Sequence, residues 1–219
     1  MKKIIIKSIG AIVLWATCIA AVFLITACTP GVVNQPETPK ETGPAESITQ
    51  IDDTAQSTTG DQPWETWTEC SQKPGDHPCN FSLVDQHGNV IELYDYYDKV
   101  IIIDLSSIWC VVCQNIATKG DEFITLYGED NFIWITVLID GPSYGVSPTP
   151  DEIQAWVETF NIQSPVLSGD RTLIDLSAET GYPITSWPTL VVIDKTMVLH
   201  NGLSGWNEAT IRAWVESLL

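Results

Sequence analysis

The sequence predicts an α/β domain over residues 64–219, in which a central mixed sheet is flanked by helices. Two continuous apolar runs, at 100–105 and 131–139, are typical of strands that are buried on both faces of a sheet. Segments with the apolar spacing of helices alternate with these strands, which is the pattern of α/β proteins. Apolar residues make up 44% of the chain, and every Trp except Trp15 lies after Asp61, so this segment contains the hydrophobic core.

The boundaries of the predicted elements follow from local signals. Gly88 lies in the turn of a hairpin, and Gly128 ends the first helix. Thr149 is a helix cap, with Pro150 at the first helical position. In chain order we expect a hairpin of strands 81–84 and 90–93, a strand at 100–105, a helix over about 111–127, a strand at 131–139, a helix over 149–160, a short strand near Val166, a helix over 173–180, strands at 189–193 and 197–199, and a helix over 207–219.

Residues 1–27 have the organisation of a secretory signal peptide. Three lysines precede an apolar run at 9–25, and Ala27 stands directly before Cys28. This arrangement resembles the bacterial lipobox, which implies that Cys28 is lipidated and anchors an extracytoplasmic protein to a bacterial membrane. An uncleaved transmembrane helix is the alternative, because the apolar run is close to the lower length limit for a span.

Residues 28–63 are expected to form a lipidated, disordered tether. Between Thr29 and Pro63 there is no aromatic residue, and such a segment buries too little apolar surface to offset its ordering entropy. Enteric lipoproteins that are retained at the inner membrane carry Asp at the position of Thr29. Because this chain lacks that Asp, the sequence favours the periplasmic side of the outer membrane in a Gram-negative host. The predicted organisation is therefore signal peptide 1–27, tether 28–63 and folded domain 64–219.

The acidic balance of the chain excludes one class of partner. The formal net charge is −18 at pH 7, and removal of residues 1–27, which contain three lysines and no acid, makes it more negative. Such a chain lacks the cations that displace counterions from phosphate backbones. We therefore expect no nucleic-acid partner.

The pair Cys110 and Cys113 is the motif that indicates chemistry. It is spaced by two valines and lies where the strand 100–105 passes into a helix. A helix N-terminus has unpaired N–H groups and a partial positive charge, which lower the pKa of a thiol there. We expect Cys110 to be the exposed nucleophile and Cys113 to be the resolving thiol. The alternatives are a static disulfide or half of a zinc site, but no second ligand pair has zinc spacing, and we expect no metal and no cofactor.

The segment from Ile103 to Cys113, with Pro188 opening a later apolar run, resembles the thioredoxin superfamily. Secreted thiol:disulfide oxidoreductases of the TlpA-like type resemble it most, since they also follow a signal and carry an extra strand and helix between the two halves. The resemblance covers about Phe81 to the C-terminus. It implies a thioredoxin-like fold with an N-terminal hairpin and a strand-helix insertion, protein thiols and disulfides as substrates, and an upstream membrane electron donor.

The same resemblance implies roles for three residues around the cysteine pair. Pro188 corresponds to the cis-proline beside the active site, in a loop that pairs with the substrate polypeptide; without the resemblance, a trans surface proline is the default. Trp109 and Trp187 are expected to contribute to substrate binding. The alternative role for Trp187 is packing over the active-site disulfide.

Asp104 lies six residues before Cys110, where the family has a buried acid beneath the second cysteine. A carboxylate next to a run of isoleucines is costly to bury, so its pKa should rise. Such an acid could take the proton of Cys113 and return it. The alternative is an Asp at the end of the strand that reaches solvent or caps the next turn.

Cys70 and Cys79 are expected to form a structural disulfide that closes a loop rich in Pro and Gly. Cysteines of an extracytoplasmic protein are usually paired. A second redox pair, or a metal site with His77, is the alternative.

Two other functions are compatible with these residues. A thiol peroxidase would need a Ser or Thr and an Arg near its reactive Cys; Ser107 has a suitable offset, and Arg171 and Arg212 are the only arginines. A copper(I)-binding lipoprotein would use Cys110 and Cys113, with His200 as a third ligand. The valines between the cysteines, and Gln114 where many thioredoxins carry a cation, leave open whether the protein reduces or oxidises its targets.

Overall fold

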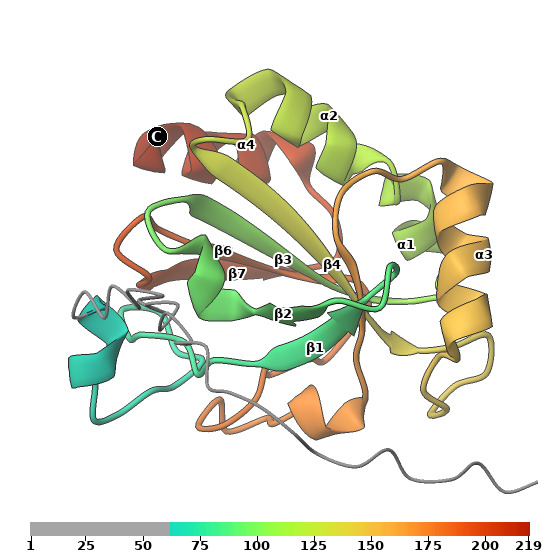
Figure 1. Ribbon diagram of the computed structural model, residues 1–219, viewed down its shortest axis with the longest axis horizontal. Coiled ribbons are helices and arrows are strands. Elements are labelled where there is room, and N and C mark those ends of the chain that lie inside the picture. The colour runs from blue at the N-terminus through green and yellow to red at the C-terminus, as the bar shows by residue number, and fades with distance from the viewer. Residues whose placement is uncertain (1–61) are drawn as a thin grey trace, which may run out of the picture. The chain divides into compact units, whose positions relative to one another are not determined.

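The computed structural model describes residues 62–219 (Figure 1). The signal peptide 1–27, lipidation at Cys28 and all but the last two residues of the tether lie outside these residues. In chain order the elements are the 3-10 helix η1 (Pro63–Thr66), strands β1 (Ser82–Asp85) and β2 (Val90–Glu92), the 3-10 helix η2 (Leu93–Tyr96), strand β3 (Val100–Ser107), helices α1 (Val111–Ile116) and α2 (Lys119–Tyr127), strand β4 (Phe132–Asp140), helix α3 (Pro150–Phe160), strand β5 (Val166–Ser168), the 3-10 helix η3 (Arg171–Leu173), strands β6 (Thr189–Ile193) and β7 (Leu199–Ser204), and helix α4 (Glu208–Leu218). None of the helices in this part of the chain has the length and apolar character to cross a membrane.

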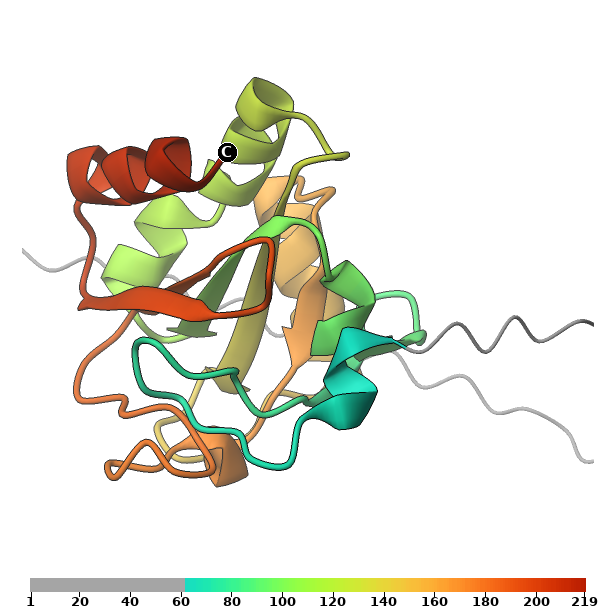
Figure 2. The ribbon, with the colours of Figure 1, turned by 90° about the vertical axis from the view of Figure 1, so that its left-hand side faces the viewer.

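The strands form one mixed sheet, which confirms the predicted fold class. The sheet has seven strands in the order β2-β1-β5-β4-β3-β6-β7. Strand β4 is parallel to both β3 and β5, whereas β6 pairs with β3 in the antiparallel direction. Figures 1 and 2 show helices α2 and α4 side by side, where the Tyr127 hydroxyl donates to Glu216 over 3.1 Å.

The two central strands supply most of the core. Every residue of β3 and β4 is buried, as their continuous apolar sequences predict. One buried cluster contains these strands together with side chains from α2, β6 and α4. A second, smaller cluster contains Cys110 and Cys113 and packs against α3. The cysteine pair therefore lies between the sheet and α3, the helix of the expected strand-helix insertion.

The single helix expected over 111–127 is divided into α1 and α2. Residues 117 and 118 form a turn in which Ala117 donates to the carbonyl of Gln114, a contact one residue shorter than an α-helical bond. The turn redirects the chain: Cys113 packs in the cluster beside α3, whereas Phe123 packs in the main core. Apolar spacing alone predicted both segments but not the turn between them.

The prediction of a helix over 173–180 is wrong. Only η3 forms, and the chain then turns around the Asp175 carboxylate, which accepts backbone N–H bonds from Ser177, Glu179 and Thr180. Ala178 adopts a left-handed conformation with φ of 59°. Asp and Ser side chains compete with helical hydrogen bonds in this way, which explains why the apolar spacing misleads.

The strand expected at 197–199 is also displaced. Asp194 accepts bonds from the backbone N–H groups of Thr196 and Val198 and holds Met197 in a turn. Strand β7 therefore starts at Leu199. The hairpin, α3 with its Thr149 cap and α4 form where the sequence predicts them.

Candidate active site

Cys110 and Cys113 lie at the junction of β3 and α1. Cys110 is the N-cap of α1, and its Sγ accepts a hydrogen bond of 3.3 Å from the backbone N–H of Cys113. Both cysteines are free thiols in this structure. Cys110 is 6% exposed and Cys113 is fully buried. Cys110 is therefore buried, not exposed as expected, and it keeps a small accessible area that Cys113 lacks.

The surroundings of Cys113 favour its protonated form. Burial raises the pKa of this thiol well above its usual range, and the hydrogen bond with Cys110 and the nearby charge of Asp104 act in the same direction. The backbone N–H of Ser107 and the hydroxyl of Ser106 oppose them by stabilising the thiolate. Cys113 needs a base before it can act as a nucleophile.

Asp104 supplies a candidate base beneath the pair. It does not reach solvent or end its strand, since β3 continues for three more residues and Asp104 is only 2% exposed. Burial raises the pKa of its carboxyl to about 7, although hydrogen bonds lower it in part. One of these bonds comes from the Ser106 hydroxyl, which donates to Oδ1 over 2.6 Å. A group with this pKa exchanges protons at neutral pH.

The segment Trp187-Pro188 lies at the same end of β3. The peptide bond between these residues is cis. Thr189, the next residue, pairs with Leu105 across the antiparallel β3–β6 ladder, which brings Pro188 close to the end of β3 from which the cysteine turn starts. Trp187 packs against the buried cluster that contains both cysteines.

Apolar side chains surround the opening at Cys110. Trp109 is 38% exposed, Val111 66% and Val112 42%. A groove of about 310 Å³ starts beside the cysteine turn, at Ile108 and Gln114, and continues along α3 to Phe160. The strand-helix insertion therefore forms one wall of the entrance.

Sequence reasoning missed Asp140 at this site and considered Arg171 only for a thiol peroxidase. Asp140, the last residue of β4, is fully buried and forms an ion pair of 2.7 Å with Arg171, which belongs to η3. It also accepts a bond of 3.3 Å from the indole N–H of Trp109. Asp140 ends an apolar run, and the reasoning applied to Asp104 could have singled it out; its pairing with Arg171 has no local signal.

The alternative ligand sets are not assembled within the described residues. No group of three His, Cys, Asp or Glu side chains gathers there in a way that could hold a metal ion. His200 is exposed on β7, where its ring lies 6.4 Å from that of Trp214. His77 stacks on Trp67 and shares a hydrogen bond of 2.7 Å with the carbonyl oxygen of Met197.

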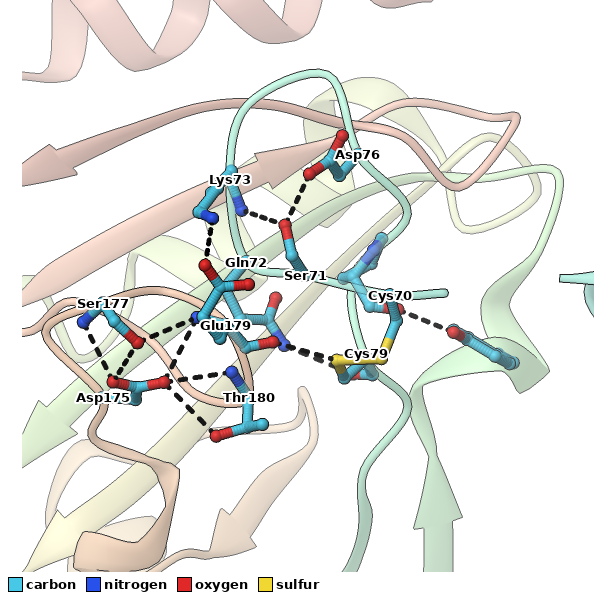
Figure 3. The surroundings of a disulfide bond; sticks show 12 residues. Cys70, Ser71, Gln72, Lys73, Asp76, Cys79, Asp175, Ser177, Glu179 and Thr180 are labelled. Atoms are coloured by element: carbon cyan, nitrogen blue, oxygen red, sulfur yellow. Dashed lines mark hydrogen bonds and ion pairs between the residues drawn. A yellow bond between two sulfur atoms is a disulfide. The ribbon is translucent and has the colours of Figure 1, made fainter. Parts of the chain in front are cut away.

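Cys70 and Cys79 are joined by a disulfide, with their Cα atoms 4.8 Å apart (Figure 3). The bond closes a loop that is anchored to the domain by main-chain hydrogen bonds with Leu199 and by an ion pair between Lys73 and Glu179. These contacts tie the segment before β1 to the turn around Asp175 and to β7. The expected pairing is confirmed, and a structural role for the bond stays a prediction.

The fold and the cysteine pair at the start of α1 define a thioredoxin-like protein. The model of the AhpC/TSA family matches residues 74–201, which is more than half of the chain, and the chain belongs to this family. No curated protein matches the chain.

Solved structures with this fold include several redox proteins. The exposed lipoprotein thioredoxin of Streptococcus pneumoniae is 24% identical with a TM-score of 0.52, and the match covers 64% of this chain and 100% of that one. A thiol:disulfide interchange protein of Chlorobium tepidum is 18% identical with a TM-score of 0.53, covering 67% and 97%. The thioredoxin domain of a Bacteroides vulgatus thiol-disulfide oxidoreductase is 15% identical with a TM-score of 0.53, covering 66% and 99%. At these identities the similarity establishes the fold.

Proposed function

We propose that this chain is an extracytoplasmic thiol:disulfide oxidoreductase of the TlpA-like type, which exchanges disulfides with protein substrates. The observation that carries the proposal is the arrangement of three residues: Cys110 at the cap of α1, Cys113 buried behind it, and Asp104 beneath. The names of the fold neighbours, which include thiol:disulfide interchange proteins, support the same activity.

The first step is attack by the Cys110 thiolate on a substrate disulfide. A bond forms between Cys110 Sγ and one substrate sulfur, while the substrate S–S bond breaks and its other sulfur leaves as a thiolate that takes up a proton. Cys110 is suited to this step because the N–H groups and partial positive charge of the α1 terminus face its sulfur. The product is a mixed disulfide.

The second step resolves the mixed disulfide. Asp104 takes the proton of Cys113, and the resulting thiolate attacks Cys110 Sγ, which forms the Cys110–Cys113 disulfide and releases the second substrate thiol. Two electrons have then passed from the dithiol to the substrate. The same steps in reverse oxidise a substrate dithiol, so the reduction potential of the pair sets the direction.

The N-terminal signals supply the proposed location. Cleavage before Cys28 and its lipidation would anchor the protein to a bacterial membrane through the tether 28–63, and a membrane electron donor would keep the pair reduced. The exposed lipoprotein named among the fold neighbours supports this proposal. Labelling with radioactive palmitate should mark the wild-type chain expressed in a bacterium but not Cys28→Ser, and equal labelling of both would contradict it.

Thiol exchange is tested on the full chain in detergent, with insulin as the disulfide substrate. The wild type should reduce insulin, Cys110→Ser should not, and Cys113→Ser should accumulate a mixed disulfide at Cys110. A wild type without exchange would refute the proposal, and peroxide consumption in its place would favour a thiol peroxidase. A reduction potential of roughly −270 mV would identify a reductant, and a value of roughly −120 mV would identify an oxidant.

A further inference from the structure

The carboxylate of Asp140 joins segments that lie far apart in the chain. Arg171 donates to it twice, from Nε over 2.8 Å and from a terminal guanidinium nitrogen over 2.7 Å. The backbone N–H of Gly145 donates over 3.0 Å and the indole N–H of Trp109 over 3.3 Å. Burial opposes ionisation, but these donors hold the pKa of Asp140 below its usual range. The carboxylate is therefore a fixed anion.

Asp140 holds the two residues that precede Cys110. Its carbonyl oxygen accepts a hydrogen bond of 3.0 Å from the backbone N–H of Ile108, and its carboxylate accepts the bond from Trp109. Both the main chain and the indole at the entrance are thereby oriented by one residue. Its geometry in turn depends on the guanidinium of Arg171, because a buried anion without its cation would move or take up a proton.

Arg171 also positions the loop between β4 and α3. Its Cζ lies 4.2 Å from the centre of the Tyr144 ring, and one terminal nitrogen lies 3.4 Å from the Tyr144 hydroxyl. The Tyr144 ring lies 5.8 Å from that of Trp109. Tyr144 is 72% exposed and Trp109, which directly precedes Cys110, is 38% exposed, so the two rings form a wall that faces solvent.

We propose that Arg171 is a positioning residue of the exchange site: through Asp140 it holds Trp109 and Tyr144 as an apolar wall, against which the polypeptide carrying the substrate disulfide packs. This inference rests on the proposed function. The positive charge of Arg171 is neutralised by Asp140, so the wall attracts apolar side chains and not anions. Exposed aromatic side chains grouped in this way are typical of protein-binding surfaces.

A small disulfide reaches Cys110 without covering the wall, whereas a protein disulfide covers both. Loss of Arg171 should therefore affect the two kinds of substrate differently. For Arg171→Gln we expect the kcat/KM for insulin to fall about tenfold, mainly through a higher KM, since charged hydrogen bonds that orient the wall are lost. The rate with oxidised glutathione should stay within about twofold of wild type.

The chain offers a matched control in Arg212. This residue also pairs with a carboxylate, Glu208, at 2.9 Å, and its Cζ lies 4.6 Å from the centre of the Phe123 ring. Arg212→Gln should leave both substrates unaffected. Arg171→Lys, which restores the charge but only one donor group, should recover part of the loss. Tyr144→Ala, a change at an exposed position, should raise the KM for insulin even if Arg171→Gln fails to fold.

A second measurement separates this inference from the proposed function. The indole N–H resonance of Trp109, assigned with Trp109→Phe, should shift and exchange faster with solvent in Arg171→Gln, and stay unchanged in Arg212→Gln. An unmoved resonance, or equal losses with insulin and oxidised glutathione, would overturn the positioning role. A wild type that exchanges no disulfide while the resonance shifts would refute the proposed function and leave the structural link between Arg171 and Trp109 established.

Discussion

Replacing Asp104 by Asn should remove a pH dependence that this buried acid imposes on the stability of the fold. Asp104 is 2% exposed, and burial raises the pKa of its carboxyl from 3.8 to about 7 despite the opposing hydrogen bond from Ser106. Between these two pH values the folded chain keeps a proton that the unfolded chain has released. The free energy of unfolding therefore falls as the pH rises through this range.

The magnitude follows from the difference between the two pKa values. The contribution of Asp104 is complete below about pH 4, where both states bind the proton, and it is lost as the pH rises through about 7. At roughly 1.4 kcal/mol for each unit of pKa, the loss amounts to about 4 kcal/mol. This is a large fraction of the stability of an ordinary domain, which is about 5–15 kcal/mol.

Urea unfolding of the full chain with its thiols held reduced, between pH 4.5 and 8.5, measures the effect. The difference in free energy of unfolding between Asp104→Asn and wild type should move in favour of the variant by about 3 kcal/mol over this range, since part of the full change lies below pH 4.5. Loss of the native contacts of Asp104 adds an offset that does not vary with pH. A difference that is constant with pH would refute the assignment of a raised pKa to Asp104.

Three further predictions concern other contacts of the domain. Ser106→Ala removes the hydroxyl that lowers the pKa of Asp104, so the pH midpoint of the resolving step should move upward; a pH profile of mixed-disulfide resolution with an unchanged or lower midpoint would contradict this. Joint replacement of Cys70 and Cys79 by Ser should reduce the free energy of unfolding by about 2–3 kcal/mol and leave insulin reduction intact, as measured by urea unfolding and the exchange assay. Gly181→Ala would place a Cβ 2.6 Å from a backbone carbonyl oxygen, and thermal unfolding should show a loss of about 1–3 kcal/mol; wild-type stability would exclude the clash.

Most of the fold could be predicted because its signals are local. The buried strands β3 and β4 are continuous apolar runs, and the capping box of α3 is visible as Thr149 followed by Pro150 and early acids. Two of the failures share one physical cause. At Asp175 and Asp194 a side chain accepts backbone N–H bonds and replaces the expected helix or strand by a turn, and apolar spacing carries no information about such competition.

The residues of the candidate site could also be predicted from local signals, but their surroundings could not. Cys110 and Cys113 could be named because their spacing falls where a predicted strand passes into a predicted helix. Asp104 could be named because the resemblance places a buried acid six residues before Cys110. The environment of Asp104 could not be predicted in this way. Its neighbours include Thr136, which lies on β4 and pairs with Asp104 across the parallel ladder. The contribution of α3 to the entrance groove likewise depends on how the insertion packs.

By itself, the sequence determined where the cysteine pair lies and which of its thiols caps α1, because the end of a buried strand and the start of a helix are local signals. The tertiary structure decided the surroundings of that pair. Burial between two strands sets the pKa of Asp104, and the link from Arg171 to Asp140 joins residues that are 31 positions apart. Desolvation and ion pairing depend on which segments lie in contact, and contacts between segments distant in the sequence exist only in the folded chain.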